Sequence, residues 1–347
     1  MKTWGKMLAG ILASVFVSSG VFAAPALPEN FTVLPLVSVG REGTLIFSDS
    51  PEYASEYGVL AEGTVAKGAG RVYYYHVNET GKPARLVVYA QAKKAQDISL
   101  TRTLRGDPST DYISTGRTLS FREVTTPTSE IKTMRLPAGK RVVLFDENEK
   151  GIRSDDLVSG IVEVETETPI TMGTALLPME TDVWLARILQ DTPYVPADSH
   201  GLRGTFPSEL LWEAGPWDFS EGAAAIVIGG LPGFQMGYDE IDKKARENFG
   251  DYGIAYHLRV KTEGTGRFKL YINPQGGVYV GSFRIGQNEK FLKFYRTETT
   301  KRGLRFGHET TEDVMEAGTW NVGQDLFIRF IPAGATYLPI RFLLVKE

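Results

Sequence analysis

Two tryptophans and two other aromatic residues lie close together in the second half of the sequence. Trp212 and Trp217 flank a Gly-Pro pair, and Phe234 and Tyr238 follow within the next segment. Exposed aromatic rings stack on sugar rings, so these four residues are candidate ligand-binding residues for a glycan. The same rings could instead pack two domains against each other, since domain packing also requires a large apolar area. The sequence favours packing and leaves the glycan surface as the alternative.

An acidic stretch in the first half offers oxygen ligands for a calcium ion. Asp146, Asn148, Asp155 and Asp156 are the candidate metal ligands, and the stretch begins like a calcium-binding loop. The twelfth position of that loop holds Leu157, where a bidentate glutamate is expected. A solvated acidic loop is therefore the preferred interpretation, with calcium as the only cofactor considered.

The histidines and cysteines argue against several kinds of catalytic or metal site. The four histidines are His76, His200, His257 and His308, and no two of them have the close spacing of a local zinc or copper site. His76 and His257 occupy similar positions in the two halves, which favours a structural role in each. The sequence contains no cysteine, which excludes disulfides, thiolate ligands and cysteine nucleophiles.

No nucleophile elbow, Walker loop or dinucleotide-binding fingerprint occurs in the sequence. We therefore predict no catalytic residues, and binding is favoured over catalysis. A glycan-directed enzyme remains the alternative, because paired carboxylates come from distant positions and leave no local motif. A cleft with two carboxyl groups about 5–10 Å apart would favour that enzyme.

Period-two alternation of apolar residues predicts the elements that must position these residues. The clearest expected strands are residues 71–77, 85–89, 141–145, 160–166, 254–260, 267–272, 278–285, 326–331 and 340–345. Glycine and proline separate these segments, as turns require. Many short strands with few helices indicate a mainly β protein, with two tandem antiparallel β-sandwich domains of jelly-roll or immunoglobulin-like type.

Two segments of the sequence are candidate helices. Ile241, Ala245 and Phe249 recur every fourth residue after a possible Asp239 cap, which predicts a helix that ends at Gly250. Residues 183–190 fit either a short helix or a strand.

A weak internal repeat suggests that the two domains arose by duplication. Tyr75-His76-Val77 leads through a glycine-containing turn to Arg85–Tyr89, and Tyr256-His257-Leu258 leads in the same way to Arg267–Tyr271. Glycines and prolines cluster between the two copies. We therefore predict an N-terminal domain over 27–190, a linker over 191–206 and a C-terminal domain over 207–347.

The first residues predict export. Lys2 and Lys6 precede an apolar stretch that ends in small residues, a pattern typical of a signal peptide over 1–23 with cleavage near Ala23. Its removal leaves 36 basic residues against 42 acidic ones, a formal charge of −6. This charge argues against nucleic acid as a partner. No later stretch approaches the ~20 apolar residues of a membrane-spanning helix.

Several stretches resemble a family of uncharacterised exported bacterial proteins that often carry a copper amine oxidase-like label. The matching segments are Asp49-Ser50-Pro51-Glu52, Gly58-Val59-Leu60, 71–83, 251–256 and 273–277. The resemblance implies a secreted or envelope-associated protein and supplies no activity. The cofactor precursor Thr-x-x-Asn-Tyr and the copper motif His-x-His are both missing from the sequence.

Together these observations predict an exported, non-catalytic β-sandwich protein of the cell envelope or extracellular space. Its expected partner is a cell-surface polysaccharide or a surface protein. The alternatives are the glycan-directed enzyme and a structural spacer stabilised by calcium.

Overall fold

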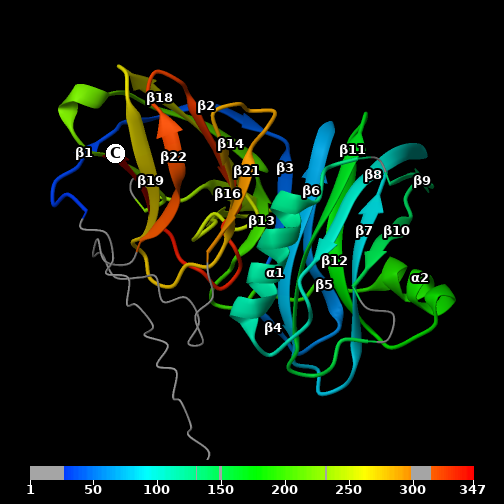
Figure 1. Cartoon of the computed structure of the whole chain (residues 1–347). Helices are drawn as coiled ribbons and strands as arrows, with labels where there is room; N and C mark the ends of the chain where they lie inside the picture. Colours follow the sequence, from blue (N-terminus) through cyan, green and yellow to red (C-terminus); the bar gives the residue numbers. More distant parts are fainter. Residues whose placement is uncertain (1–26, 130, 148–150, 231–232, 298–313) are drawn as a thin grey trace, which may run out of the picture.

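A computed structural model describes residues 27–129, 131–147, 151–230, 233–297 and 314–347 of the chain. The protein is mainly β, as predicted, and its strands form two β-sandwiches that pack against each other (Figure 1). The predicted signal peptide lies outside the described residues. Within the described ranges, no helix combines the length and the apolar character needed to cross a bilayer.

The first sandwich consists of a nine-stranded and a four-stranded sheet. In spatial order the nine-stranded sheet contains β17 (Lys244–Glu247), β16 (Met236–Asp239), β13 (Arg203–Phe206), β3 (Thr44–Ser48), β6 (Gly68–Asn78), β11 (Leu157–Thr166), β8 (Gln96–Arg105) and β9 (Lys132–Leu136), with β4 (Tyr53–Ala54) beside β6. The four-stranded sheet contains β10 (Arg141–Asp146), β7 (Ala84–Gln91), β12 (Ile170–Pro178) and β5 (Gly58–Val65). Alternate residues of both sheets, such as Val72, Tyr74, Leu86 and Val88, fill the space between them.

The second sandwich consists of a six-stranded and a five-stranded sheet. The six-stranded sheet contains β2 (Leu36–Glu42), β14 (Glu209–Asp218), β18 (Ala255–Glu263), β23 (Leu326–Phe330), β20 (Ser282–Gly286) and β21 (Lys293–Arg296). The five-stranded sheet contains β1 (Thr32–Val33), β15 (Ala224–Ile228), β24 (Ile340–Lys346), β19 (Arg267–Pro274) and β22 (Met315–Asn321). Each of the nine expected strands corresponds to a strand of the structure, although residues 278–281 precede β20 rather than extend it.

The two sandwiches have matching strand orders. The order β3-β6-β11-β8-β9 in the first corresponds to β14-β18-β23-β20-β21 in the second. The facing sheets match as well, with β5-β12-β7-β10 corresponding to β15-β24-β19-β22. In both sandwiches the first pair of each longer series, β3 with β6 and β14 with β18, is parallel. This correspondence supports a duplication, but the repeated motif is a crossing between facing sheets rather than a hairpin, since β6 and β7 belong to different sheets.

Sheet pairing crosses the predicted division of the chain. Strands β1 and β2 precede β3 in the sequence, yet they pair with β15 and β14 of the second sandwich. In return, β13 lies within the predicted linker and pairs with β3 of the first sandwich. The hairpin of β16 and β17 also joins the nine-stranded sheet, through β13. Each sandwich therefore contains strands supplied by the other half of the chain.

The predicted helix over residues 241–249 is wrong. The Asp239 side chain accepts hydrogen bonds from the backbone N–H groups of Ile241 and Asp242, at 2.9 and 3.2 Å, and closes a turn between β16 and β17. Its other oxygen accepts from the buried Arg203, so Asp239 is fixed by the first sandwich rather than by a helix. An Asp side chain satisfies the same backbone donors in a turn as at a helix start, so the sequence pattern was ambiguous.

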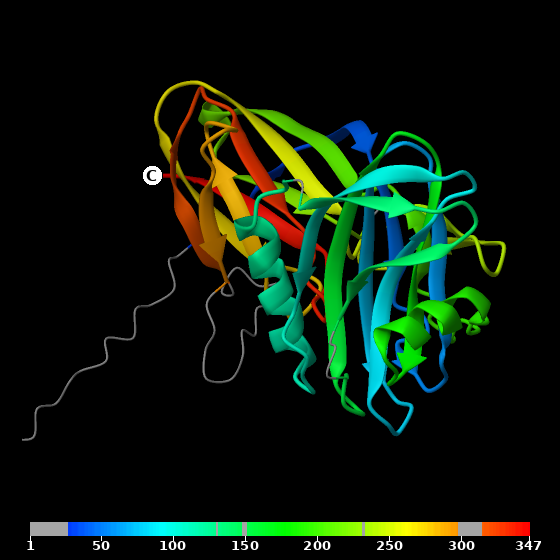
Figure 2. The ribbon, with the colours of Figure 1, turned by 90° about the vertical axis from the view of Figure 1, so that its right-hand side faces the viewer.

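The two helices have different positions. Helix α2 (Asp182–Asp191) covers the ambiguous segment 183–190 and packs on the four-stranded sheet through Leu185 and Leu189. Helix α1 (Tyr112–Thr125) lies along the junction between the sandwiches, as Figures 1 and 2 show. The close approach at α1 requires glycine, because a Cβ on Gly116 would lie 2.2 Å from the carbonyl oxygen of Gly334. A 3₁₀ turn, η1 (Phe219–Glu221), follows β14.

A network of buried and half-buried charges crosses the junction beside α1. Its members, called the junction network below, are Arg71, Arg102, Glu123, Glu163, Glu209, His257 and Arg329. Glu163 accepts from Arg71 at 2.8 Å and from Arg102 at 2.7 Å within the nine-stranded sheet. Glu123 of α1 accepts from Arg102 at 3.2 Å and from Arg329 of the six-stranded sheet at 2.6 Å. Glu209 accepts from Arg71 at 3.1 Å and pairs with His257 at 2.5 Å.

The arginines keep the buried carboxylates ionised. Burial alone would raise the pKa of Glu123, but the charges and hydrogen bonds of Arg329 and Arg102 outweigh it and lower that pKa. Burial also opposes ionisation of Glu209, while the hydrogen bond with His257 and the charge of Arg71 lower its pKa to about 2. The network therefore joins α1 and both sandwiches. Removing one partner would leave a buried charge uncompensated, which destabilises the fold.

Glu123→Gln tests the importance of the junction network. We expect a loss of about 3 kcal/mol in the free energy of unfolding, because the variant leaves Arg102 and Arg329 buried with less compensating charge. Chemical denaturation at neutral pH measures this loss. Glu167→Gln is the matched control, since Glu167 pairs with Lys67 at an exposed site and its loss should change stability little. Equal stabilities of the two variants would contradict the assigned role of the network.

Candidate functional site

Trp217 is a core residue of the second sandwich and does not form a binding surface. Its side chain is fully buried (0% exposed), and its indole N–H donates to the Gly222 carbonyl oxygen at 3.1 Å. Its ring packs edge-on against Phe219 and Phe268, with centroids 5.7 and 5.4 Å away. The packing alternative therefore describes Trp217, although it packs within one sandwich rather than between two.

The structure brings two of the other candidate aromatics to one cavity. Trp212 on β14 and Phe234 in the loop before β16 both line a cavity of about 590 Å³, called the Trp212 cavity below. Tyr238 on β16 is 45% exposed and is not part of the wall of this cavity. The lining residues come from distant parts of the sequence, for example Leu36 of β2 and Met236 of β16.

Two residues that line the Trp212 cavity each have a buried polar atom without a partner. The Trp212 Nε1 atom and the Gln235 Oε1 atom are both buried, and neither has a hydrogen-bond partner among the described residues. Both residues line the cavity, together with Arg41 and Asp251. Buried polar atoms normally find a partner, so these two atoms distinguish Trp212 and Gln235 from the other polar residues of the wall.

Asp251 is the acidic group of this cavity, and both of its oxygens are occupied. One accepts from the Gln235 backbone N–H at 2.7 Å, and the other accepts from the Tyr256 hydroxyl. Burial raises the pKa of Asp251 to about 6, although both hydrogen bonds act in the opposite direction. The residue has a positive φ of 50°, a conformation that Asp and Asn tolerate better than most other residues.

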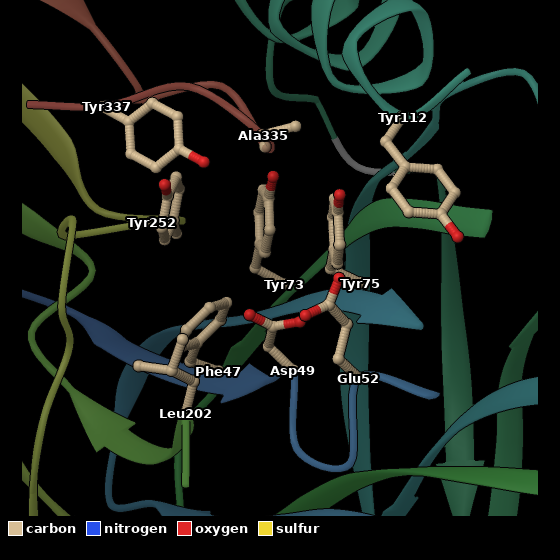
Figure 3. Close-up of a pocket in the computed structure, with 11 residues that line it drawn as sticks. Phe47, Asp49, Glu52, Tyr73, Tyr75, Tyr112, Leu202, Tyr252, Ala335 and Tyr337 are labelled. Carbon is tan, nitrogen blue, oxygen red and sulfur yellow. The ribbon is translucent and has the colours of Figure 1, made fainter. Parts of the chain in front are cut away.

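A second, smaller pocket lies where the two sandwiches meet, and Figure 3 shows it. We call it the tyrosine pocket, with a volume of about 230 Å³, and it is lined by Phe47, Asp49, Glu52, Tyr73, Tyr75, Tyr112, Leu202, Tyr252, Gly334, Ala335 and Tyr337. Strands β3 and β6 supply one wall, the start of α1 supplies another, and segments 252 and 334–337 of the second sandwich complete it.

Two carboxyl groups lie at one end of the tyrosine pocket. Asp49 follows β3 and is 8% exposed, and its Oδ1 atom is buried without a partner in the part of the chain that the structure describes. Burial and the neighbouring Glu52 and Asp198 hold the pKa of Asp49 well above its usual value. Burial likewise raises the pKa of Glu52, while His200 opposes the shift.

The predicted calcium ligands that the structure describes, Asp146, Asp155 and Asp156, do not form a cluster with one another. The Asp146 carboxylate accepts from Arg85 at 2.8 Å, and that of Asp156 accepts from Arg153 at 2.9 Å. Asn148 lies outside the described residues, and Asp155 adopts a positive φ of 68° in the turn before β11. Among the residues that are described, no three His, Asp or Glu side chains come together as a metal site. Asp146 and Asp156 are instead paired with arginines, and Asp156 is buried, so neither interpretation of the loop describes it fully.

The two framework histidines have different surroundings. His76 is buried, with one ring nitrogen 2.8 Å from the Pro51 carbonyl oxygen and the other 2.7 Å from the Ser48 hydroxyl. Burial lowers the pKa of His76 to about 4, so it is neutral at physiological pH. His257 instead belongs to the junction network, so matching positions in the repeat do not carry the same role.

Sequence reasoning missed the tyrosine pocket, because its residues are distributed from position 47 to position 337. One signal was present. Three of the segments that resemble the exported bacterial family contribute to the lining: 49–52 and 71–83 supply two residues each, and 251–256 supplies one. Their convergence could have been suspected from the aromatic and acidic side chains that they share.

Comparisons with known proteins leave the function open. No protein-family model matches the chain, and no curated protein matches it. Among solved structures it is similar to the tandem CBM22-1–CBM22-2 domain of Xyn10C from Paenibacillus barcinonensis, with 10% identity over 90% of this chain and 92% of that one, at a TM-score of 0.17. Tripeptidyl peptidase 2 matches with 7% identity over 91% of this chain and 24% of that one, at a TM-score of 0.16. The STIV MCP matches with 10% identity over 87% and 95%, at a TM-score of 0.17. Scores at this level carry no functional inference.

Asp251→Asn tests the electrostatics of the Trp212 cavity. The folded protein holds the Asp251 proton up to a pH of about 6, whereas the unfolded chain releases it near its ordinary pKa of 3.8. The folded state therefore binds more protons in this window, so Asp251 makes the wild type lose stability as the pH rises from about 4 to 6. A shift of this size corresponds to about 3 kcal/mol.

The measurement is chemical denaturation of wild type and variant at pH 4 and pH 7. Asn suits the positive φ and keeps one acceptor, so any fixed cost of the substitution is the same at both pH values. The stability of the variant relative to wild type should rise by about 2–3 kcal/mol between these pH values. A constant difference would show that Asp251 titrates normally.

Proposed function

We propose that this is an exported protein that binds a cell-envelope polysaccharide without catalysis, and that the Trp212 cavity holds one unit of the polymer. The observation that carries the proposal is that two residues lining one cavity, Trp212 and Gln235, each have a buried polar atom without a partner, Nε1 and Oε1. A sugar hydroxyl both donates and accepts, so it can satisfy a donor and an acceptor of this kind.

The composition of the cavity supports a sugar over a purely apolar ligand. The rings of Trp212 and Phe234 offer apolar faces to the C–H face of a sugar, while Arg41 and Gln235 offer polar atoms. A volume of about 590 Å³ falls within the ~300–1,000 Å³ that small-ligand pockets typically occupy. Apolar side chains such as Leu36 and Met236 line the cavity beside these polar groups.

The state of the acidic groups favours binding over glycoside hydrolysis. Asp251 is the acid of the Trp212 cavity, and both of its oxygens already accept hydrogen bonds. The tyrosine pocket does contain two carboxyl groups, the feature that the enzyme alternative requires. The pKa values of Asp49 and Glu52 are both raised, whereas an acid and its ionised partner require shifts in opposite directions.

Export is part of the proposal and rests on the predicted signal peptide over 1–23, which lies outside the described residues. A secreted or envelope-associated location would expose the protein to the polysaccharide that we infer as its ligand. The acidic net charge is compatible with a neutral or basic polymer.

Co-sedimentation of the purified protein with isolated cell-envelope polysaccharide tests the proposal. We expect saturable binding by wild type and at least about tenfold weaker binding by Trp212→Ala, which removes the ring and its unpaired donor. Trp184→Ala is the matched control, because Trp184 is a tryptophan on α2 that is 52% exposed and distant from the cavity in sequence. Trp217 is unsuitable as a test position because it is a core residue.

Two results would contradict the proposal. Absence of saturable binding by wild type would remove the polysaccharide as ligand and leave a surface protein as the partner to examine. Equal loss of binding in Trp212→Ala and Trp184→Ala would show that the effect does not come from the cavity. Circular dichroism of both variants verifies that they fold.

A further inference from the structure

The tyrosine pocket shares no lining residue with the Trp212 cavity, and its chemistry is different. Its walls are mostly aromatic, and the charged groups that line it are acidic. No Lys, Arg or His is among its lining residues within the described ranges. In the junction network nearby, by contrast, each buried carboxylate is paired with a basic side chain.

Asp49 is the group that most needs a partner. It is more than nine-tenths buried, and its Oδ1 atom has no hydrogen-bond partner among the described residues. The charged groups that act on Asp49 and Glu52 include Asp198 and His200, and the two acids also act on each other. Asp198 is held by the Ser50 hydroxyl at 2.8 Å and by the Glu52 backbone N–H at 2.9 Å, so it adds a fixed negative charge. In an empty pocket burial favours the neutral form of Asp49, and its Oδ1 atom still lacks a partner.

Aromatic rings surround the two carboxyl groups. In Figure 3 the carboxyl groups of Asp49 and Glu52 lie together, with the rings of Phe47, Tyr73 and Tyr75 beside them. The Phe47 and Tyr73 rings are in contact, with centroids 5.8 Å apart. Ring faces attract cations through their quadrupole, and the attraction is strongest where water is excluded.

We propose that the tyrosine pocket binds the primary ammonium group of a small ligand, with Asp49 as its principal charge partner. An ammonium group supplies N–H donors for the unpaired Oδ1 atom and a positive charge for the two acids. Anions are disfavoured by Asp49, Glu52 and Asp198. Calcium or magnesium is disfavoured because two carboxyl groups among aromatic rings provide fewer oxygen ligands than such ions require. The volume of about 230 Å³ suits a single small group rather than a long chain segment.

Isothermal titration calorimetry of the purified protein at neutral pH tests this site. The probes are n-butylammonium and its neutral counterpart n-butanol, followed by glucosamine and N-acetylglucosamine. We expect at least one amine to bind and its neutral counterpart to bind at least about tenfold more weakly, since only the amine compensates Asp49. Comparison of the two amines shows whether the ammonium group is carried on an alkyl chain or on a sugar.

The variants separate binding from folding. Asp49→Asn should abolish the preference for the amine, while its thermal midpoint stays equal to or above that of wild type, because the uncompensated acid is gone. A group needed only for structure would instead lower the midpoint. Asp97→Asn, at an exposed acid paired with Arg135, is the matched control and should bind as wild type does. If Asp49→Asn fails to fold, Glu52→Gln serves as the second variant and should weaken amine binding.

Three outcomes overturn the proposal. The first two are no heat of binding with either amine, and equal binding of each amine and its neutral counterpart. Amine binding that persists unchanged in both Asp49→Asn and Glu52→Gln also overturns it, since the site would then be elsewhere. None of these results depends on the polysaccharide or on Trp212.

Discussion

Glu123 lies where α1 meets both sandwiches, and arginines from two different sheets donate to its carboxylate. Arg102 comes from the nine-stranded sheet and Arg329 from the six-stranded sheet, so this one acid joins elements separated by about two hundred residues in sequence. Removing charges from water is expensive, and the arrangement is tolerable because each buried acid of the junction network has a basic partner. The relative placement of the sandwiches depends on that compensation.

The same junction determines where sites can form. Where the junction network ends, the outer face of the nine-stranded sheet continues with Tyr73 and Tyr75 on β6, two and four residues after Arg71. Alternation along the strand places all three side chains on one face. Pairing is complete around Arg71 but not around Asp49, which has an unpaired oxygen. The tyrosine pocket is thus a continuation of the junction in which aromatic rings replace the basic partners.

Sequence alone was sufficient for the fold class and for most strands, because period-two alternation reports burial directly. It failed where one residue type serves two structures, as when Asp239 closed a turn instead of starting a helix. Trp217 was ambiguous for a similar reason, since large rings suit both cores and binding surfaces. The partners of Asp49 and Glu123 could not be predicted, because both depend on contacts between distant segments. Glycine-rich segments likewise gave no sign that strands are exchanged between sandwiches.

That exchange means that each half of the chain supplies strands that complete a sheet of the other. Consider a chain cut before β13, within the predicted linker. In the N-terminal fragment β3 would lose its neighbour β13, and in the C-terminal fragment β14 would lose its neighbour β2. Each fragment would then present an open sheet edge, with unpaired N–H and C=O groups that can recruit another strand. The strand that pairs with each edge in the intact chain lies in the other fragment, so the two fragments should reassemble when present together. Alone, each fragment would be prone to pair with copies of itself.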